Sequence, residues 1–200
     1  MINLKNKKTY IITGNPNKAK NAIEILDTVL DNVAHYSLDL PEIQSLNLKE
    51  VVANKLQFAL DNFKSGTLEQ AYLIVEDISL EFEAMGKLPG TFIKFFCSEL
   101  GLEKMCKMLN ALDDANNRKA TIKCVIGIAK LGEKNIDNAI FLESQLKGAI
   151  SDAPRGNNGF GFDKIFKPEI FNNKTAGELT NIEYKKYFAT IRNYQRLVKL

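Results

Sequence analysis

Residues 71–90 read AYLIVEDISLEFEAMGKLPG, and this stretch predicts the strand around which the rest of the chain is organised. It begins with five apolar or aromatic residues, a run that is too short for a buried helix and typical of a strand covered on both faces. Glu76 and Asp77 follow at the C-terminal end of that run. Open α/β sheets bind ligands outside the carboxyl ends of their strands, so a catalytic acid pair is expected at this place. A solvated strand end is the commoner alternative for an isolated Glu-Asp pair, because acidic side chains are mostly exposed.

The composition is that of an ordinary globular domain. The chain has 200 residues, of which 45% are hydrophobic and 26% charged, enough for one domain with a substantial core. Its net charge of +3 suits a polyanionic small ligand but gives no argument for a nucleic-acid partner. The sequence contains no signal peptide and no apolar run of about 20 residues, so we expect no membrane partner and a cytoplasmic, reducing environment.

The few cysteine and histidine residues narrow the possible chemistry. Cys97, Cys106 and Cys124 are odd in number and lack CxxC spacing, so they predict neither a disulfide framework nor a zinc site. His35 is the single histidine, which argues against a histidine-based triad. Catalysis is therefore expected to rest on Asp, Glu, Lys and a hard cation such as Mg²⁺.

The first elements predict a turn suited to an anion. Residues 9–13 are predicted to form a strand, residues 14–17 a turn, and residues 18–30 a helix with a lysine in its first turn. This arrangement directs N–H groups and a cation at an anion. The spacing of a P-loop is absent, and a purely structural turn explains the pattern equally well.

The middle of the chain continues the α/β pattern. A second strand is predicted at 33–38, and residues 48–63 form an amphipathic pattern typical of a helix. Lys55 lies near the apolar stripe of this helix, where a buried stem under an exposed ammonium group is the commoner explanation. The remaining elements of this part are the continuation of the acidic strand over 80–84, a turn at 86–90 and a helical region at 91–111 that breaks near Gly101.

The last third of the chain begins with a predicted hairpin. Alternating residues over 122–128 and 138–149 predict an antiparallel pair, distinct from the buried run at 71–75. A glycine-rich loop follows at 155–163. A helix over 177–199 ends the chain, and its apolar spacing predicts that it faces the core.

Five motifs occur in order along the chain: TGNPNK at 13–18, LPEIQ at 40–44, VED at 75–77, LPGTFIKFF at 88–96 and GFGFDKIFKPE at 159–169. Together they resemble the inosine triphosphate pyrophosphatases, which remove non-canonical purine nucleoside triphosphates. The resemblance runs from about Thr9 to about Glu178 and so covers most of the chain.

This resemblance implies a fold and a reaction. The fold is an elongated α/β domain of two lobes over residues 1–200, with a long mixed sheet flanked by helices and a central cleft, usually as a homodimer. The reaction is the hydrolysis of nucleoside triphosphates such as ITP and XTP to the monophosphate and pyrophosphate, with Mg²⁺ as cofactor. The charge of the substrate agrees with this composition, because a triphosphate carries about four negative charges and needs cations and oriented N–H groups.

The resemblance also implies roles for individual residues. The phosphate-holding positions match Thr13, Asn15, Lys18, Lys55 and Lys94. Glu42 and Asp77 match the metal-binding acids, and Asp77 also matches the residue that orients or deprotonates the attacking water. The loop that clasps the purine matches Phe160, Phe162 and Asp163, where an aromatic face can stack on the base.

Several of these roles have alternatives. Core packing is the alternative for Phe162, and a solvated surface position is an equal alternative for Lys55 and Lys94. Glu76 is expected either to support the metal site or to be an ordinary strand-end acid.

The C-terminal part departs from the family pattern. The family carries a lysine and, four residues later, a Ser-His-Arg triplet that recognises the oxo group of the base. Counted without gaps, those places hold Tyr184, Phe188, Ala189 and Thr190, so the polar donors are absent. Lys185 and Arg192 lie nearby and are candidates to replace them. Ile78 stands where relatives carry a hydroxyl directly after the acid pair.

Two hypotheses follow from these departures. The first is an active pyrophosphatase with altered or broadened base preference, because losing hydrogen-bond donors relaxes discrimination. The second is a degenerate relative that binds nucleotide or dimerises without turnover. Retention of Lys18, Glu42 and Asp77 favours the first.

Overall fold

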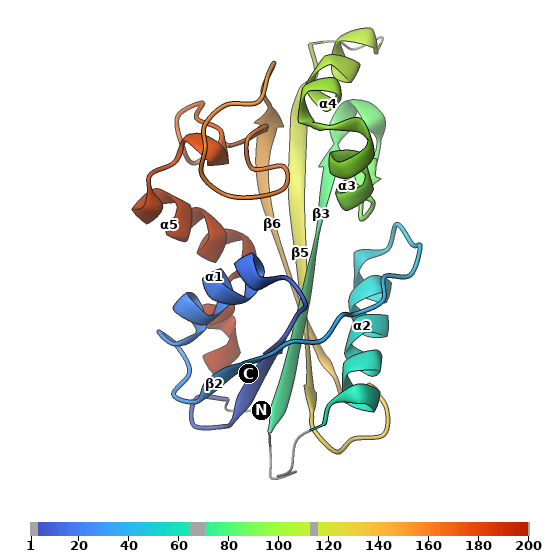
Figure 1. Cartoon of the computed structure of the whole chain (residues 1–200), viewed down its shortest axis with the longest axis vertical. Coiled ribbons are helices and arrows are strands. Elements are labelled where there is room, and N and C mark those ends of the chain that lie inside the picture. The colour runs from blue at the N-terminus through green and yellow to red at the C-terminus, as the bar shows by residue number, and fades with distance from the viewer. Residues whose placement is uncertain (1–3, 65–70, 113–115, 200) are drawn as a thin grey trace. The chain divides into compact units, whose positions relative to one another are not determined.

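The computed structural model describes residues 4–64, 71–112 and 116–199 and has the predicted α/β class with a mixed sheet (Figure 1). The strands are β1 Thr9–Ile12, β2 Val33–Tyr36, β3 Tyr72–Phe82, β4 Pro89–Gly90, β5 Lys119–Lys130, β6 Ile140–Ile150 and β7 Phe166–Pro168. Their order is β2-β1-β3-β5-β6-β7, and β4 pairs with β3. β1 is parallel to β2 and β3, whereas the pairs β3–β4 and β6–β7 are antiparallel.

The helices are α1 Pro16–Leu26, α2 Leu48–Asn62, α3 Ile93–Phe95, α4 Leu102–Met108 and α5 Asn181–Arg192. The predicted bounds are closest for α2. α1 begins two residues before the predicted start, because Asn15 caps it and Pro16 takes the first helical position. Among the described residues, no helix has the length and apolar character needed to cross a membrane.

The prediction of one continuous helix over 177–199 is wrong. α5 ends at Arg192, and a separate 3₁₀ segment, Tyr194–Lys199, follows. The residue between them, Asn193, has a φ of 38°, in the left-handed region that ends a helix. The apolar spacing continued across this break, so periodicity alone did not reveal it.

The strands of the predicted hairpin correspond to β5 and β6, which are elements distinct from the buried run at 71–75 and neighbours in the sheet order. That run is the first part of β3, an 11-residue strand, and β5 lies next to β3 in the same sheet. β5 alternates between buried and partly buried residues only over 120–123 and is buried continuously over 124–129. Burial on each face depends on which helices cover it, not on which sheet the strand joins.

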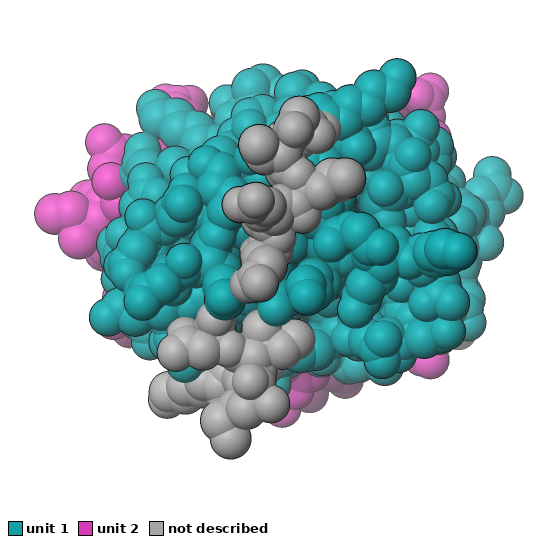
Figure 2. Space-filling view, turned by 90° about the horizontal axis from the view of Figure 1, so that it is seen from below, with its two compact units in different colours: residues 1–77, 125–143, 192–200 teal, residues 78–124, 144–191 magenta. Residues whose placement is uncertain are grey.

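The chain divides into two compact units, coloured separately in Figure 2. Unit 1 comprises Met1–Asp77, Val125–Glu143 and Arg192–Leu200, and unit 2 comprises Ile78–Cys124 and Ser144–Ile191. β3 passes from unit 1 to unit 2 between Asp77 and Ile78. The predicted domain of two lobes over residues 1–200 stays a prediction.

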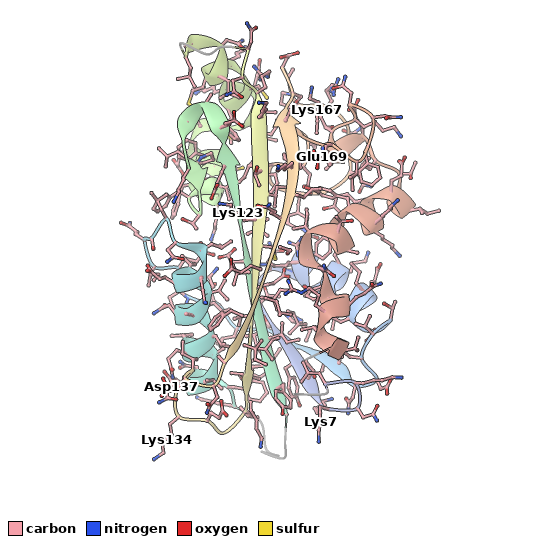
Figure 3. All side chains as sticks on the ribbon, turned by 180° about the vertical axis from the view of Figure 1, so that it is seen from behind. Lys7, Lys123, Lys134, Asp137, Lys167 and Glu169 are labelled. Atoms are coloured by element: carbon pink, nitrogen blue, oxygen red, sulfur yellow. The ribbon has the colours of Figure 1, made fainter. Side chains whose placement is uncertain are left out.

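In unit 1, α1 and α2 lie on opposite faces of β1 and β3 (Figure 1). The core on the α2 side contains Ile12, Leu48, Val52, Leu56, Ala59, Leu73, Val75, Val125 and Ala129. The glycine at position 127 lets α2 approach β5 closely, because a Cβ there would lie 2.9 Å from Val52 and 3.2 Å from Leu56. Lys134 and Asp137, labelled in Figure 3, lie in the loop between β5 and β6.

In unit 2, aromatic side chains from the loop before β7 and from α5 pack together. Phe162 meets Phe166 edge-on with ring centroids 6.5 Å apart, and Tyr187 lies 6.5 Å from Phe166 and 5.6 Å from Tyr184. All four side chains are buried. This cluster attaches the glycine-rich loop to α5.

Candidate active site

The two acids at the centre of β3 point to opposite faces of the sheet. Successive side chains of a strand alternate, so Asp77 shares a face with Val75, and Glu76 shares the other face with Ile74. Val75 belongs to the core under α2, whereas Glu76 meets Lys18 of α1. The Glu-Asp pair is therefore divided between two clusters within unit 1.

The first cluster joins Asp77, Lys55 and Glu42. The Nζ of Lys55, which comes from α2, donates hydrogen bonds to Asp77 Oδ2 at 2.5 Å and to Glu42 Oε1 at 2.8 Å. Lys55 is only 4% exposed. The expectation of a buried stem with a solvent-exposed ammonium group is therefore wrong. Burial alone would lower the pKa of Lys55, but the charges and hydrogen bonds of Asp77 and Glu42 outweigh burial and raise this pKa.

The carboxylates of this first cluster fit the ligand preference of a Mg²⁺ ion. Among the described residues, no group of three or more His, Cys, Asp and Glu side chains gathers, so an all-protein cage is not formed there. Mg²⁺ normally takes only one or two carboxylates and completes its shell with waters and phosphate oxygens. Glu42 and Asp77 converge on a single nitrogen, and both side chains are partly exposed. Glu42 and Asp77 thus supply the one or two carboxylates that a Mg²⁺ site normally takes from a protein.

The second cluster surrounds Glu76. Arg192 Nε donates to Glu76 Oε1 at 2.7 Å, and Tyr194 Oη donates to Glu76 Oε2 at 2.5 Å. The side chains of Glu76 and Arg192 are 1% and 3% exposed. Burial alone would raise the pKa of Glu76, but the charges of Arg192 and Lys18 and the hydrogen bond from Tyr194 lower it. An ordinary solvated strand-end acid is therefore excluded.

Lys18 connects α1 to this second cluster. Its Nζ donates to the backbone carbonyl of Glu76 at 2.9 Å and lies 3.6 Å from the Oε1 atom of the same residue. The side chain of Lys18 is 14% exposed. The carbonyl belongs to the peptide that joins Glu76 to Asp77, so Lys18 is held at the backbone of the acid pair, on the face of Glu76.

The turn before α1 is held mainly by its own side chains. Asn15 Oδ1 accepts hydrogen bonds from the backbone N–H groups of Asn17 at 3.0 Å and Lys18 at 3.1 Å. Thr13 Oγ1 accepts one from the N–H of Asn15 at 3.1 Å. His35 Nε2 lies 2.8 Å from the carbonyl oxygen of Thr13. Two N–H groups of the first helical turn are therefore bonded to the cap, and the ammonium group of Lys18 is the cation at this helix start.

The glycine-rich loop of unit 2 folds around Asp163. This buried carboxylate accepts hydrogen bonds from the N–H of Phe160 at 2.9 Å, from Tyr184 Oη at 2.7 Å and from Tyr187 Oη at 3.0 Å. Gly159 has a φ of 76°, and a Cβ there would lie 2.4 Å from Asp163 Oδ2. The loop can close on Asp163 because this position is glycine.

The predicted substrate-binding residues of unit 2 occupy different environments. Phe162 is 6% exposed and packs in the aromatic cluster, which is the alternative that the sequence left open. Phe160 is half-buried at the loop surface. Lys94 lies exposed on α3. Phe160 and Lys94 are thus accessible to a ligand, whereas Phe162 supports the loop from inside.

The divergent positions of α5 serve mainly packing. Tyr184 bonds Asp163, Phe188 is 1% exposed, and Thr190 donates to the backbone carbonyl of Lys186 at 2.8 Å. Arg192 is engaged with Glu76, so the structure gives it a role other than the predicted base contact. Nothing in the structure explains the apolar residue at position 78.

Sequence reasoning missed two partners of Glu76 and both tyrosine partners of Asp163. Arg192 and Tyr194 lie 116 and 118 residues from Glu76 along the chain. No local pattern connects residues at such separations. Tyr187 could have been found from its spacing, because it lies three residues after Tyr184 and so on the same face of α5.

Comparisons with known proteins identify the family of the chain. Residues 9–199 match the profile of the Ham1 family. The chain is 34% identical over 180 residues to "Inosine triphosphate pyrophosphatase 1" of Trypanosoma cruzi, covering 89% of this chain and 84% of that protein. It is 30% identical over 193 residues to the "dITP/XTP pyrophosphatase" of Ignicoccus hospitalis, covering 96% of each.

Solved structures show the same fold. The Ham1 protein of Staphylococcus aureus superposes with a TM-score of 0.67 at 21% identity, and a HAM1 protein of Coxiella burnetii with 0.67 at 24% identity. In both cases the match covers 96% of this chain and 95% of the other. The predicted fold class is thereby confirmed, and so is the family identified from the five motifs: the chain belongs to the Ham1 family.

Proposed function

We propose that this protein hydrolyses non-canonical purine nucleoside triphosphates such as ITP and XTP to the monophosphate and pyrophosphate. Relatives that cover most of the chain are named inosine triphosphate pyrophosphatase and dITP/XTP pyrophosphatase. The observation that carries the proposal is the convergence of Glu42 and Asp77 on Lys55, directly after the continuously buried run at 72–76 of β3. Two carboxylates and a buried ammonium group suit a phosphoanhydride hydrolase that uses a divalent cation.

Glu42 and Asp77 are the residues that would hold Mg²⁺, and the bound ion would neutralise phosphate charge and polarise the scissile phosphorus. Asp77 also orients or deprotonates the attacking water, since it is the partly exposed acid of the β3 pair. Lys18 and Lys55 bind phosphate oxygens with their ammonium groups. Lys94 adds a third cation in the same role.

The remaining contacts position the nucleotide. Thr13 and Asn15 shape the turn that carries Lys18 to the phosphates. The ring of Phe160 stacks on the purine, with Phe162 and Asp163 fixing the loop that presents it. Base preference is broadened, because the positions where the family carries polar donors contribute Tyr184 and Phe188 to the interior.

The reaction is tested by measuring pyrophosphate release with Mg²⁺ from ITP, XTP, dUTP and the four standard triphosphates. We expect release from ITP and XTP and measurable release from at least one standard triphosphate. Asp77→Asn should lower kcat by roughly a hundredfold or more, as loss of a general base does. Asp137→Asn, an exposed acid in the loop between β5 and β6 (Figure 3), is the matched control and should leave kcat unchanged.

Each outcome decides between the hypotheses. A folded protein that releases pyrophosphate from none of these triphosphates would support the degenerate relative and sink the hydrolase. Release confined to ITP and XTP would refute the broadened base preference alone. A homodimer and the use of Mg²⁺ rather than another divalent cation are parts of the proposal that follow from the resemblance, and a cytoplasmic location is a part that follows from the composition.

A further inference from the structure

We propose that Arg192 and Tyr194 are positioning residues for the phosphate-binding lysine of α1. They hold both carboxylate oxygens of Glu76, so that Glu76 does not capture Lys18, and the ammonium group of Lys18 stays available to the triphosphate. The inference rests on the proposed function, because it assigns a purpose to residues around the same site. It also gives Arg192 a role that differs from base recognition.

The charges of the second cluster carry the first step of the argument. One carboxylate, Glu76, faces two cations, Arg192 and Lys18. The guanidinium group lies 2.7 Å from Oε1, whereas the ammonium nitrogen lies 3.6 Å from the same atom. Arg192 makes the closer of the two ion pairs with Glu76, and one carboxylate between two cations leaves this cluster with a net charge of about +1.

The hydrogen bonds carry the second step. Tyr194 donates to the other carboxylate oxygen at 2.5 Å, so both oxygens of Glu76 already have a strong donor. Lys18 donates instead to the backbone carbonyl of Glu76 at 2.9 Å. A neutral carbonyl holds an ammonium group in place more weakly than a carboxylate does, so the lysine is oriented without being neutralised.

Burial carries the third step. The side chains of Glu76 and Arg192 are almost completely shielded from water, whereas that of Lys18 is 14% exposed. A buried carboxylate that lost its guanidinium partner would be costly and would take the nearest cation. Among the described residues that bond Glu76, that cation is Lys18. Removing Arg192 should therefore turn Lys18 inward and weaken phosphate binding.

The test is a set of combined variants assayed for ITP hydrolysis. Arg192→Met should raise the KM for ITP roughly tenfold, the worth of one hydrogen bond to a charged group, with a much smaller change in kcat. Adding Glu76→Gln to Arg192→Met should restore KM toward the wild-type value, because the unpaired carboxylate is gone. If Arg192 has a purely structural role, adding Glu76→Gln should raise KM further, because each further substitution in a core destabilises it.

A second cycle asks whether Lys18 is the group that is affected. In a Lys18→Met background, Arg192→Met should leave KM unchanged, because Arg192 is expected to act on KM only through Lys18. The two side chains are linked through Glu76, to which both of them donate hydrogen bonds. Arg192→Lys should have a KM close to the wild-type value, because it preserves the positive charge. Arg196→Met, an exposed arginine of the same segment that donates to the carbonyl of Glu143, is the matched control and should not change KM.

If Arg192→Met does not fold, Tyr194→Phe tests the same inference. It removes one hydroxyl group and should raise KM by about threefold in the same direction. Folding of every variant is checked by circular dichroism and thermal unfolding. Additive effects of Arg192→Met and Lys18→Met on KM, or a KM that Glu76→Gln fails to restore, would overturn the inference.

The inference can fail independently of the proposed function. If the wild-type protein releases pyrophosphate and the variants behave additively, the hydrolase stands and the positioning role falls. If the wild-type protein releases no pyrophosphate, the same variants are compared by calorimetric titration with ITP. In that case, a Kd that follows the predicted pattern would support positioning in a nucleotide-binding protein, and an unchanged Kd would refute it.

Discussion

At the scale of single residues, Lys55 is held by two carboxylates that are also the expected ligands of a divalent cation. An ammonium group between Glu42 and Asp77 neutralises part of their charge in the absence of a metal. Under the proposed function, Mg²⁺ would therefore compete with Lys55 for the same oxygens. The displaced ammonium group can then turn to a phosphate oxygen, so metal and nucleotide are expected to favour each other's binding.

Lys55→Met should therefore strengthen Mg²⁺ binding to the nucleotide-free protein by roughly tenfold, because two charge-assisted hydrogen bonds no longer compete. The same substitution should raise the KM for ITP. Calorimetric titration with MgCl₂ measures the first effect, and Lys134→Met, an exposed lysine of unit 1 (Figure 3), is the control. Mg²⁺ binding that is unchanged or weaker in Lys55→Met would contradict the competition.

Cys97 offers a second residue-scale prediction, in unit 2. Burial, followed by the negative charge of Asp163, raises the pKa of the Cys97 thiol to about 11. Because only the thiolate reacts with iodoacetamide, only about one molecule in a thousand is reactive at pH 8. The alkylation rate of native Cys97 should therefore rise about tenfold per pH unit until the pH approaches this pKa.

Removing the charge should lower this pKa. We expect Asp163→Asn to speed alkylation of Cys97 at pH 8 by roughly threefold, whereas Glu99→Gln, at an exposed position, should not. Mass spectrometry of the modified peptide gives the rate at this cysteine. Equal rates in the wild-type protein and Asp163→Asn would show that the charge of Asp163 has no influence on the thiol.

At the scale of elements, the start of α1 depends on one side chain. Asn15 bonds two N–H groups that would otherwise lack a partner within the helix. Asn15→Ala should lower the free energy of unfolding by about 1 kcal/mol, as measured in urea. Asn17→Ala, on the exposed first turn of the same helix, is the control and should change it by less than about 0.5 kcal/mol. Similar losses in both variants would mean that Asn15 does not act as the cap.

The elements were the part of the fold that the sequence predicted best. The continuous apolar run at 71–75, the alternation that begins at Leu80 and the helical spacing at 48–63 each report a local rule, and β3 and α2 follow these rules. The end of α5 was missed because Asn193 adopts a left-handed conformation that leaves the apolar spacing intact. The helix boundary depends there on a single backbone angle, which periodicity does not contain.

The clusters of the site were only partly predictable. Lys18, Glu42 and Asp77 were found through motifs, since each motif marks a position in a known fold. The partners of Glu76 come from a segment that diverges from those motifs, so no resemblance indicated them. Their interaction with Glu76 depends on the fold, which brings the segment after Arg192 next to β3 within unit 1.

At the scale of the whole molecule, the last residues complete a unit that begins at the N-terminus. Tyr194 and Leu197 are fully buried, although they follow the end of α5. Leu197→Ala should lower the free energy of unfolding by about 2–5 kcal/mol, because it leaves a cavity in a core that distant segments share. Val198→Ala is the matched control, since Val198 is 36% exposed, and should cost less than about 1 kcal/mol. A small effect of Leu197→Ala would show that the tail is dispensable for stability.

The division of the acid pair has a consequence for how this chain tolerates insertions and deletions. β3 is aligned with β1 so that Tyr72 lies opposite Thr9 and Ile74 opposite Ile11. One extra residue between Ile74 and Glu76 would turn both acids over, bringing Glu76 toward Lys55 and Asp77 toward Arg192. Every functional residue would still be present, yet each carboxylate would have the other's neighbours. In this strand, an odd or even position along the chain decides which acid is partly exposed to solvent and which is buried.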